Sequence, residues 1–256
     1  MTDWQSARDG QGSGGDDPVV CGVDGCPLGW LAVFRTLGGT PRHTRRVFAE
    51  FRDLLTCAEA PAIIAVDMPI GLPERAGPGG RGPERAVRPL LGDRKSSVFS
   101  IPSRAAVLAG DYREACGIAL ETSEPPRKVS RQGFALFPKI LEIDALMSPE
   151  LESRIYEVHP ELAFWRLNGE APMSEPKKVK GRAAGLGIVQ RQALLERHGF
   201  DPAFFEAPRP PRVGADDVVD AAAAAVIAER IFFNRAEAFP AEPNRDARGL
   251  RMAIWA

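Results

Sequence analysis

The sequence predicts an α/β protein in which helices cover a β-sheet and a helical insertion lies beside the sheet. An apolar run over residues 19–34 is interrupted by a turn between Gly25 and Gly29, which is typical of an antiparallel hairpin. A continuous apolar run over residues 62–72 is typical of a strand covered on both faces. Residues 216–228 predict an alanine-rich helix, whose small side chains allow close approach to a sheet.

The segment between these two apolar runs completes the first half of the sheet. Residues 42–51 predict a third strand, with Val47 and Phe48 as its apolar content. A short helix around residues 54–58 ends at Pro61. The apolar run that follows carries an acid where it gives way to a proline and a glycine, so the fourth strand ends there.

Residues from about 73 to 150 are predicted to form the helical insertion. Residues 73–83 are rich in Gly, Pro and Arg, so we expect a loop that packs loosely and moves over a site. Helical patterns follow over residues 84–91, 105–120 and 132–147.

The last part of the chain predicts one more sheet strand, two long helices and an edge strand. Residues 154–161 alternate as a strand does, and Pro160 ends that strand and begins a helix. A basic segment then leads a long helix that ends at His198. We expect residues 201–213 to be weakly structured and residues 251–255 to close the chain as an edge strand.

The composition is typical of a soluble globular protein, with 44% hydrophobic and 26% charged residues in a chain of 256. No apolar run is long enough for a membrane helix, so we expect no membrane partner. Residues 1–17 predict a disordered leader and not a signal peptide, and residues 18–256 a single domain. Four cysteines without Cys-x-x-Cys spacing fit reduced thiols. These features together predict a cytoplasmic protein.

The formal net charge of -1 argues against a surface that is basic throughout and coated with nucleic acid. Basic residues gather instead in two segments. Residues 75–104 hold seven basic and two acidic side chains, and residues 177–197 hold six and one. Each segment is either a solvated face or a phosphate-binding surface. The candidate substrate-binding residues in them are Arg94, Lys95, Ser96, Lys177 and Lys178.

Acidic residues lie at the ends of four predicted elements. Asp24 lies at the hairpin turn, Asp67 ends the fourth strand, and Glu157 lies in the later strand. Asp217 and Asp220 share one face of the last helix. Carboxylates gathered together need a cation, and oxygen ligands favour Mg²⁺ or Mn²⁺. Two such ions activate a water and stabilise the leaving oxygen of a phosphodiester, so these five acids are the candidate catalytic residues.

Each acid also has a structural interpretation. Asp24 and Asp67 are both placed where an Asp can start a turn. Asp216 is predicted to cap the last helix and not to bind a metal. His159 is interpreted as a structural residue or as support for the site, because no partner for a catalytic histidine is identified. Lys139 is interpreted as an ordinary surface residue.

Five segments, taken in order, carry a resemblance to a known superfamily. They are Gly22-Val23-Asp24-Gly25 with Gly29-Trp30, Ala65-Val66-Asp67-Met68-Pro69-Ile70-Gly71, Arg94-Lys95-Ser96-Ser97-Val98-Phe99, Glu157-Val158-His159-Pro160-Glu161 and Asp216-Asp217-Val218-Val219-Asp220-Ala221-Ala222. With them the sequence resembles the ribonuclease H-like superfamily from about Val19 to Trp255. Within that superfamily it resembles the family called domain of unknown function 429, described as predicted ribonuclease H-like nucleases.

The resemblance implies a ribonuclease H-like mixed sheet of about five strands, flanked by helices and carrying a helical insertion. By resemblance to the Holliday-junction resolvase branch, the metal ligands would be Asp24, Asp67, Asp217 and Asp220. Glu157 falls where a related branch carries an acid on its fifth strand. One departure from the resolvase pattern is Asp in place of Glu at position 67, whose shorter reach alters the metal spacing.

Three functions compete. The first is a metal-dependent nuclease that hydrolyses phosphodiester bonds in RNA or DNA with Mg²⁺ or Mn²⁺. The second is a non-catalytic domain that keeps the fold and binds nucleic acid or protein. The third is a phosphotransferase of the actin and sugar-kinase superfamily, although the sequence has neither its usual duplication nor a second glycine-rich phosphate loop. The sequence leaves open whether the chain forms an oligomer.

Overall fold

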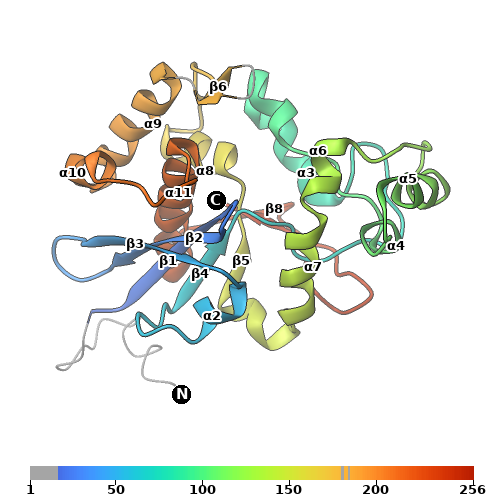
Figure 1. Cartoon of the computed structure of the whole chain (residues 1–256), viewed down its shortest axis with the longest axis horizontal. Coiled ribbons are helices and arrows are strands. Elements are labelled where there is room, and N and C mark those ends of the chain that lie inside the picture. The colour runs from blue at the N-terminus through green and yellow to red at the C-terminus, as the bar shows by residue number, and fades with distance from the viewer. Residues whose placement is uncertain (1–16, 180–181, 184) are drawn as a thin grey trace.

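The computed structural model describes residues 17–179, 182–183 and 185–256, and its centre is a mixed five-stranded sheet of order β3-β2-β1-β4-β5 (Figure 1). The strands are β1 (Val19–Cys26), β2 (Gly29–Thr36), β3 (His43–Phe48), β4 (Ile63–Val66) and β5 (Ile155–Glu157). The first three are antiparallel neighbours, whereas β4 and β5 run parallel to β1. This confirms the predicted α/β fold with a mixed sheet, which is consistent with a ribonuclease H-like fold. The predicted leader lies outside the described residues, apart from Asp17.

The register of the parallel strands brings three acids to one edge of the sheet. Val23 of β1 lies opposite Val66 of β4, and Val66 lies opposite Glu157 of β5. Asp24 and Asp67 are the next residues after that paired row. Parallel strands end at a common edge, so acids that are far apart in sequence become neighbours.

Helices cover both faces of the sheet because successive residues of each strand point to opposite sides. On one face pack α8 (Pro160–Leu167), α9 (Gly185–Arg197), α10 (Pro202–Glu206) and α11 (Ala215–Phe232). On the other face lie α2 (Phe51–Leu55) and α7 (Phe137–Leu146). In β1, for example, Val20 belongs to the first core and Cys21 to the second. The predicted helices 54–58 and 216–228 are thus present, with shifted ends.

The contact between α11 and β1 depends on Gly22. A Cβ atom at Gly22 would lie 2.1 Å from the backbone oxygen of Ala221 and 2.1 Å from the backbone nitrogen of Ala225. Only glycine therefore lets the helix backbone approach the strand this closely. The predicted role of the alanine-rich helix is confirmed, and its partner is the glycine two residues before Asp24.

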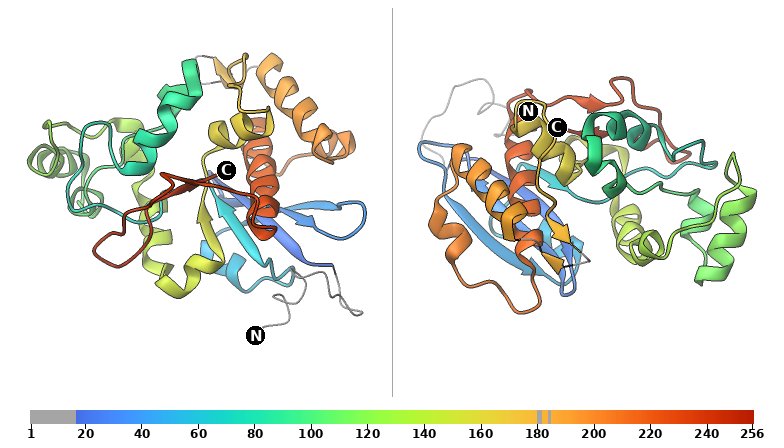
Figure 2. Two further views of the ribbon diagram at one scale, coloured as in Figure 1. Left: turned by 180° about the vertical axis from the view of Figure 1, so that it is seen from behind. Right: turned by 90° about the horizontal axis from the view of Figure 1, so that it is seen from above.

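The insertion extends to one side of the sheet in both Figure 1 and Figure 2. Its helices are α3 (Gly82–Val87), η1 (Arg88–Ser97), α4 (Arg104–Val107), α5 (Tyr112–Glu121), α6 (Arg131–Ala135) and α7, followed by η2 (Pro149–Ser153). They are shorter than predicted. The helix expected over 105–120 is broken because Asp111 caps the start of α5. Its side chain accepts hydrogen bonds from the backbone N–H groups of Arg113 and Glu114. The helix expected over 132–147 is broken at Leu136, which is followed by the first turn of α7.

The end of the chain differs from the prediction. Residues 251–255 do not form an edge strand of the main sheet. Instead β9 (Ile254–Trp255) pairs with β8 (Ala238–Phe239) in a separate two-stranded sheet. A second two-stranded sheet joins β6 (Lys178–Val179) to β7 (Arg182–Ala183). Among the described residues no helix is both long and apolar enough to cross a membrane.

Candidate functional site

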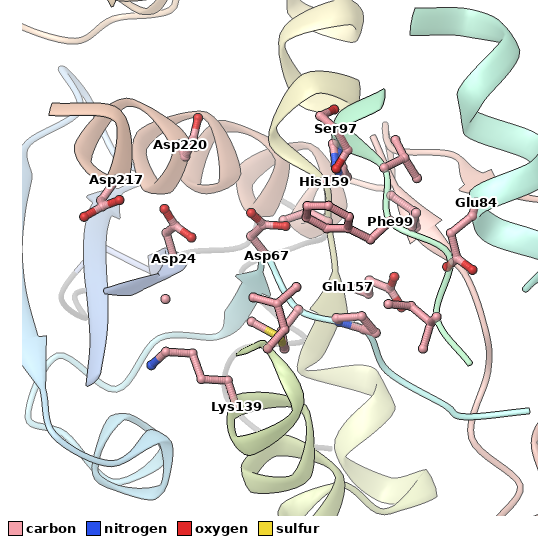
Figure 3. A pocket seen from close by; sticks show the side chains of 18 of the residues that line it. Asp24, Asp67, Glu84, Ser97, Phe99, Lys139, Glu157, His159, Asp217 and Asp220 are labelled. Carbon is pink, nitrogen blue, oxygen red and sulfur yellow. The ribbon is translucent and has the colours of Figure 1, made fainter. Parts of the chain in front are cut away.

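A cavity of about 330 Å³ opens at the sheet edge where Asp24 and Asp67 lie, beside the first turns of α11 (Figure 3). We call it the acidic cavity. Its charged or titratable lining residues are Asp24, Asp67, Arg81, Glu84, Lys139, Glu157, His159, Lys177, Asp216, Asp217 and Asp220. All five acids predicted to be catalytic therefore line one cavity, although they come from three strands or strand ends and one helix.

Asp24 reaches the cavity because it lies on the α11 face of β1. It is two residues beyond Gly22, so both point to the same side of the strand. That side meets the N-terminal part of α11, where Asp217 and Asp220 lie. Burial and the nearby carboxylates of Asp67, Asp220 and Asp217 raise the pKa of Asp24 well above its usual range.

Asp67 directly follows β4, and its backbone N–H donates to the carbonyl of Val23 at 2.9 Å. This bond extends the parallel ladder by one step and holds Asp67 next to Asp24. In Figure 3 the two carboxylates point toward one another beneath α11. Burial raises the pKa of Asp67 to about 7, with Asp220 adding to the rise and Lys177 opposing it. The carboxylates of Asp24 and Asp67 therefore carry more negative charge than the nearby cations neutralise.

Asp220 is bound to a lysine. Asp220 is 4% exposed, and the ammonium of Lys177 forms a salt bridge with its Oδ2. The other carboxylate oxygen, Oδ1, is buried and has no hydrogen-bond partner. Burial disfavours the charged amine, but Asp220 and Glu161 raise the pKa of Lys177 above its usual value. Lys177 is therefore an ammonium ion that partly neutralises the carboxylates. In Figure 3 the carboxylate of Asp220 points away from Asp24 and Asp67.

The carboxylates of Asp24, Asp67 and Asp220 suit a hard divalent cation, because such ions prefer oxygen ligands. One of these oxygens, Asp220 Oδ1, is buried without a hydrogen-bond partner. In the present side-chain directions, no three or more His, Cys, Asp or Glu among the described residues are placed to hold a metal ion. The residues therefore fit Mg²⁺ or Mn²⁺ in chemistry, and Asp220 has to turn from Lys177 before it can join Asp24 and Asp67.

Glu157 is held by Arg81, which lies in the loop that is predicted to pack loosely. Arg81 is 3% exposed and donates to both oxygens of Glu157, from Nη2 to Oε1 at 2.5 Å and from Nη1 to Oε2 at 3.1 Å. The backbone N–H of Ile70 also donates to Oε2, at 2.8 Å. Glu84 pairs with the same arginine at 2.6 Å. The prediction that residues 73–83 pack loosely is wrong, because this buried ion pair anchors the loop.

Two more side chains, Lys139 and His159, line the acidic cavity. Lys139 is not an ordinary surface residue. It lines the cavity, donates to the carbonyl of Gly29 at 2.5 Å and lies 4.3 Å from the centre of the Trp30 ring. His159 also lines the cavity, and burial together with Lys177 lowers its pKa to about 4. Its ring is neutral near pH 7, and Nδ1 is buried with no hydrogen-bond partner.

A known family model covers most of the chain. The family model described as "Protein of unknown function (DUF429)" matches residues 22–245, a span that includes every acid of the cavity. The chain belongs to this family. No curated protein and no solved structure gives a significant match.

In this DUF429 chain the acids of α11 differ from the prediction in one respect. Asp216 is not the N-cap. Gly214 occupies that position, and Asp217 reaches back to accept its backbone N–H at 2.8 Å. Asp217 therefore stabilises the first turn of α11 while it lines the acidic cavity.

The predicted substrate-binding residues of this DUF429 chain separate into different places. Lys177 lies in the acidic cavity, whereas Lys95 and Ser96 line a neighbouring cavity. Arg94 lines neither of the two. Lys178 lies in β6, and its side chain is outside the described part of the structure.

Proposed function

We propose that this protein is a metal-dependent nuclease that hydrolyses phosphodiester bonds in RNA or DNA. The observation that carries the proposal is the meeting of Asp24, Asp67 and Asp220 in one cavity. Each carboxylate has a pKa raised by burial, and each lies within reach of the others' charge. Such a cluster is unfavourable in the absence of cations and favourable with a divalent one. Clustered carboxylates of this kind are typical of enzymes that act on phosphodiesters.

In the proposal, Asp24, Asp67 and Asp220 hold Mg²⁺ or Mn²⁺, with Asp217 beside them. The bound ions lower the pKa of a water molecule and neutralise charge on the phosphate. Lys177 balances the carboxylates before the ions bind and remains close enough to meet the anionic substrate. His159 is neutral, so its unpartnered Nδ1 accepts a hydrogen bond instead of adding charge.

Glu157 has a different role in the proposal. Both of its oxygens accept hydrogen bonds from Arg81, and Oε2 also accepts one from the backbone N–H of Ile70. We therefore assign it to holding the end of β5 and the loop against the cavity. Its role as a catalytic residue remains a prediction.

One observation favours a second candidate, a non-catalytic nucleic-acid or protein interaction domain. Lys177 already pairs with Asp220, and a permanent pair would leave no site for a second cation. The phosphotransferase alternative gains no support from the single five-stranded sheet among the described residues.

The test is cleavage of labelled single-stranded RNA, single-stranded DNA, RNA–DNA hybrid and branched DNA by purified protein with Mn²⁺ or Mg²⁺. We expect cleavage that EDTA stops and that Asp24→Asn and Asp220→Asn each abolish. Asp53→Asn is the matched control, because Asp53 is an exposed acid on α2 outside the cavity. Cleavage that persists in both site variants would contradict the proposal.

Calorimetry with Mn²⁺ separates the two candidates independently of cleavage. The nuclease requires Mn²⁺ binding that Asp24→Asn removes and Asp53→Asn leaves intact. An interaction domain with a permanent Lys177–Asp220 pair shows no such acid-dependent binding.

A further inference from the structure

A second cavity of about 560 Å³ lies in the helical insertion next to the acidic cavity. We call it the basic cavity. Four cationic side chains from two separate segments line it, and they are Arg88, Lys95, Arg127 and Lys128. No Asp or Glu is among its described lining residues. Its size lies within the range of about 300–1,000 Å³ that is usual for ligand pockets.

Arg88 is fixed in place by backbone groups. Its Nε and Nη2 donate to the carbonyl of Val98 at 3.1 and 2.9 Å, and Nη2 also donates to Ser100 Oγ at 2.9 Å. Its Nη1 donates to the carbonyl of Gly79. Gly79 has φ +84°, and a Cβ there would lie 3.1 Å from Nη1. The glycine loop thus holds the guanidinium at the cavity wall.

The four cations lie along a cavity lining that includes no acid among the described residues. Burial lowers the pKa of Arg88, the charge of Glu84 opposes this shift, and the charge of Arg127 adds to it. Within the described part of the chain, none of the four cations has a carboxylate at salt-bridge distance. Like charges held together in this way are stabilised when an anion binds between them.

The two cavities share a wall. Val98, Phe99 and Ile101 line both of them. A ligand with phosphates at regular intervals can therefore place one phosphate at the carboxylates and another among the cations. Phe99 supplies an aromatic surface at the boundary, and aromatic side chains beside a basic groove are the usual means of binding single-stranded nucleic acid.

We propose that the basic cavity binds a phosphate of the same single-stranded nucleic acid that places another phosphate at the acidic cavity. This inference rests on the proposed function, because the acidic cavity has to receive a phosphate of the same strand. It assigns Lys95 to this cavity together with Arg88, Arg127 and Lys128. The substrate class is single-stranded RNA or DNA.

The test is the binding of a fluorescein-labelled ten-nucleotide oligo(dT), measured by anisotropy in EDTA. Arg127 and Lys128 are exposed, so Arg127→Glu/Lys128→Glu and the milder Arg127→Gln/Lys128→Gln leave the core intact. The matched control is Arg42→Glu/Arg52→Glu, which reverses two exposed charges outside both cavities and outside both basic segments.

We expect the Glu pair to weaken binding at least about tenfold and the control at most about twofold, with the Gln pair in between. The slope of log affinity against log salt should fall by about 0.7 to 1.4 for both pairs and stay unchanged for the control, because one or two phosphate contacts are lost. Equal losses in the pair and the control would overturn the proposal. Tighter binding of a duplex than of the single strand would also overturn it, as would binding of inorganic phosphate without binding of the oligonucleotide.

The failure of this inference and the failure of the nuclease proposal give different results. If no metal or substrate produces cleavage but the tenfold difference in binding persists, the nuclease proposal fails and the phosphate site stands. If Mn²⁺-dependent cleavage occurs and the Glu pair has the wild-type KM, the phosphate site fails and the nuclease proposal stands.

Discussion

The ammonium of Lys177 forms a salt bridge with the carboxylate of Asp220 in the wall of the acidic cavity. The second oxygen of Asp220 is buried without a partner, and Asp24 and Asp67 lie close enough for their charges to interact with it. Lys177 therefore supplies the positive charge that the carboxylates share in the absence of metal. A divalent ion at the same carboxylates has to compete with Lys177 for Asp220.

Lys177→Met should make that competition visible. Without the ammonium we expect Mn²⁺ to bind roughly tenfold more tightly, a change of about 1.4 kcal/mol. In EDTA the variant should lose about 3 kcal/mol of unfolding free energy, because Asp220 is left buried and unpaired. Calorimetry and urea unfolding measure the two effects. Lys177→Arg keeps the charge and is the control. If Lys177→Met binds Mn²⁺ no more tightly than the wild type, the competition is absent.

Asp67→Asn should stabilise the metal-free protein. The folded pKa is about 7 against an ordinary 3.8, so the folded state binds more protons than the unfolded state between these pH values. Ionised Asp67 thus costs stability above pH 7, and the cost disappears as the pH falls toward 4. In EDTA at pH 8 we expect Asp67→Asn to gain roughly 1–3 kcal/mol in urea unfolding, and less at pH 5. A loss at pH 8 would contradict this account, and Asp53→Asn should change little at either pH.

Breaking the pair of Arg81 and Glu157 should be costly. Their side chains are 0% and 5% exposed, so Glu157→Gln leaves a buried guanidinium poorly paired. We expect a loss of about 3–5 kcal/mol. The triple variant Arg81→Met/Glu84→Gln/Glu157→Met should recover part of that loss, because it also removes the charge of Glu84, which pairs with the same arginine. Wild-type stability of Glu157→Gln together with lost Mn²⁺ binding would identify Glu157 as a metal ligand instead.

Gly22→Ala should disrupt the contact of α11 with the sheet. The new methyl group would collide with backbone atoms of Ala221 and Ala225, which cannot move without shifting the helix. We expect a loss of more than about 3 kcal/mol or failure to fold. Gly117→Ala is the matched control, because Gly117 lies within α5 and a Cβ there meets nothing within 4 Å. That variant should gain roughly 0.5–1 kcal/mol.

His43 should make the protein sensitive to acid. Burial and then the charge of Arg35 lower its pKa to about 4 from an ordinary 6.5. Its Nε2 lies 2.7 Å from Arg35 Nη1, which can only donate, so the folded state needs a neutral ring. Between pH 6.5 and 4 the unfolded chain binds more protons, so stability falls as the pH drops through this range. His43→Gln keeps an acceptor without titrating. Its urea unfolding free energy should depend less steeply on pH, and an unchanged slope would contradict this role.

The sequence alone predicted the main elements of the sheet and the acids at their ends, because these follow from local patterns. The hairpin and the fourth strand each appear in the sequence as an apolar run, and the last helix appears as an alanine-rich run. Asp24 and Asp67 were identifiable because an acid at the end of an apolar strand needs a partner. The helices of the insertion were less accurate, since a single cap such as Asp111 divides a continuous periodic pattern.

Tertiary structure decided which charges meet. Arg81 lies in a glycine- and proline-rich loop whose local sequence predicts loose packing, yet it is buried against Glu157, which is 76 residues away along the chain. The partner of Asp220 and the grouping of Arg88 with Arg127 likewise depend on long-range folding. Hydrophobic periodicity acts within one element, whereas the pairing of a buried charge is set by whatever the fold brings beside it. The sequence by itself determined at which element ends the acids of this protein lie. Only the folded chain decided that Lys177 pairs with Asp220 in the acidic cavity.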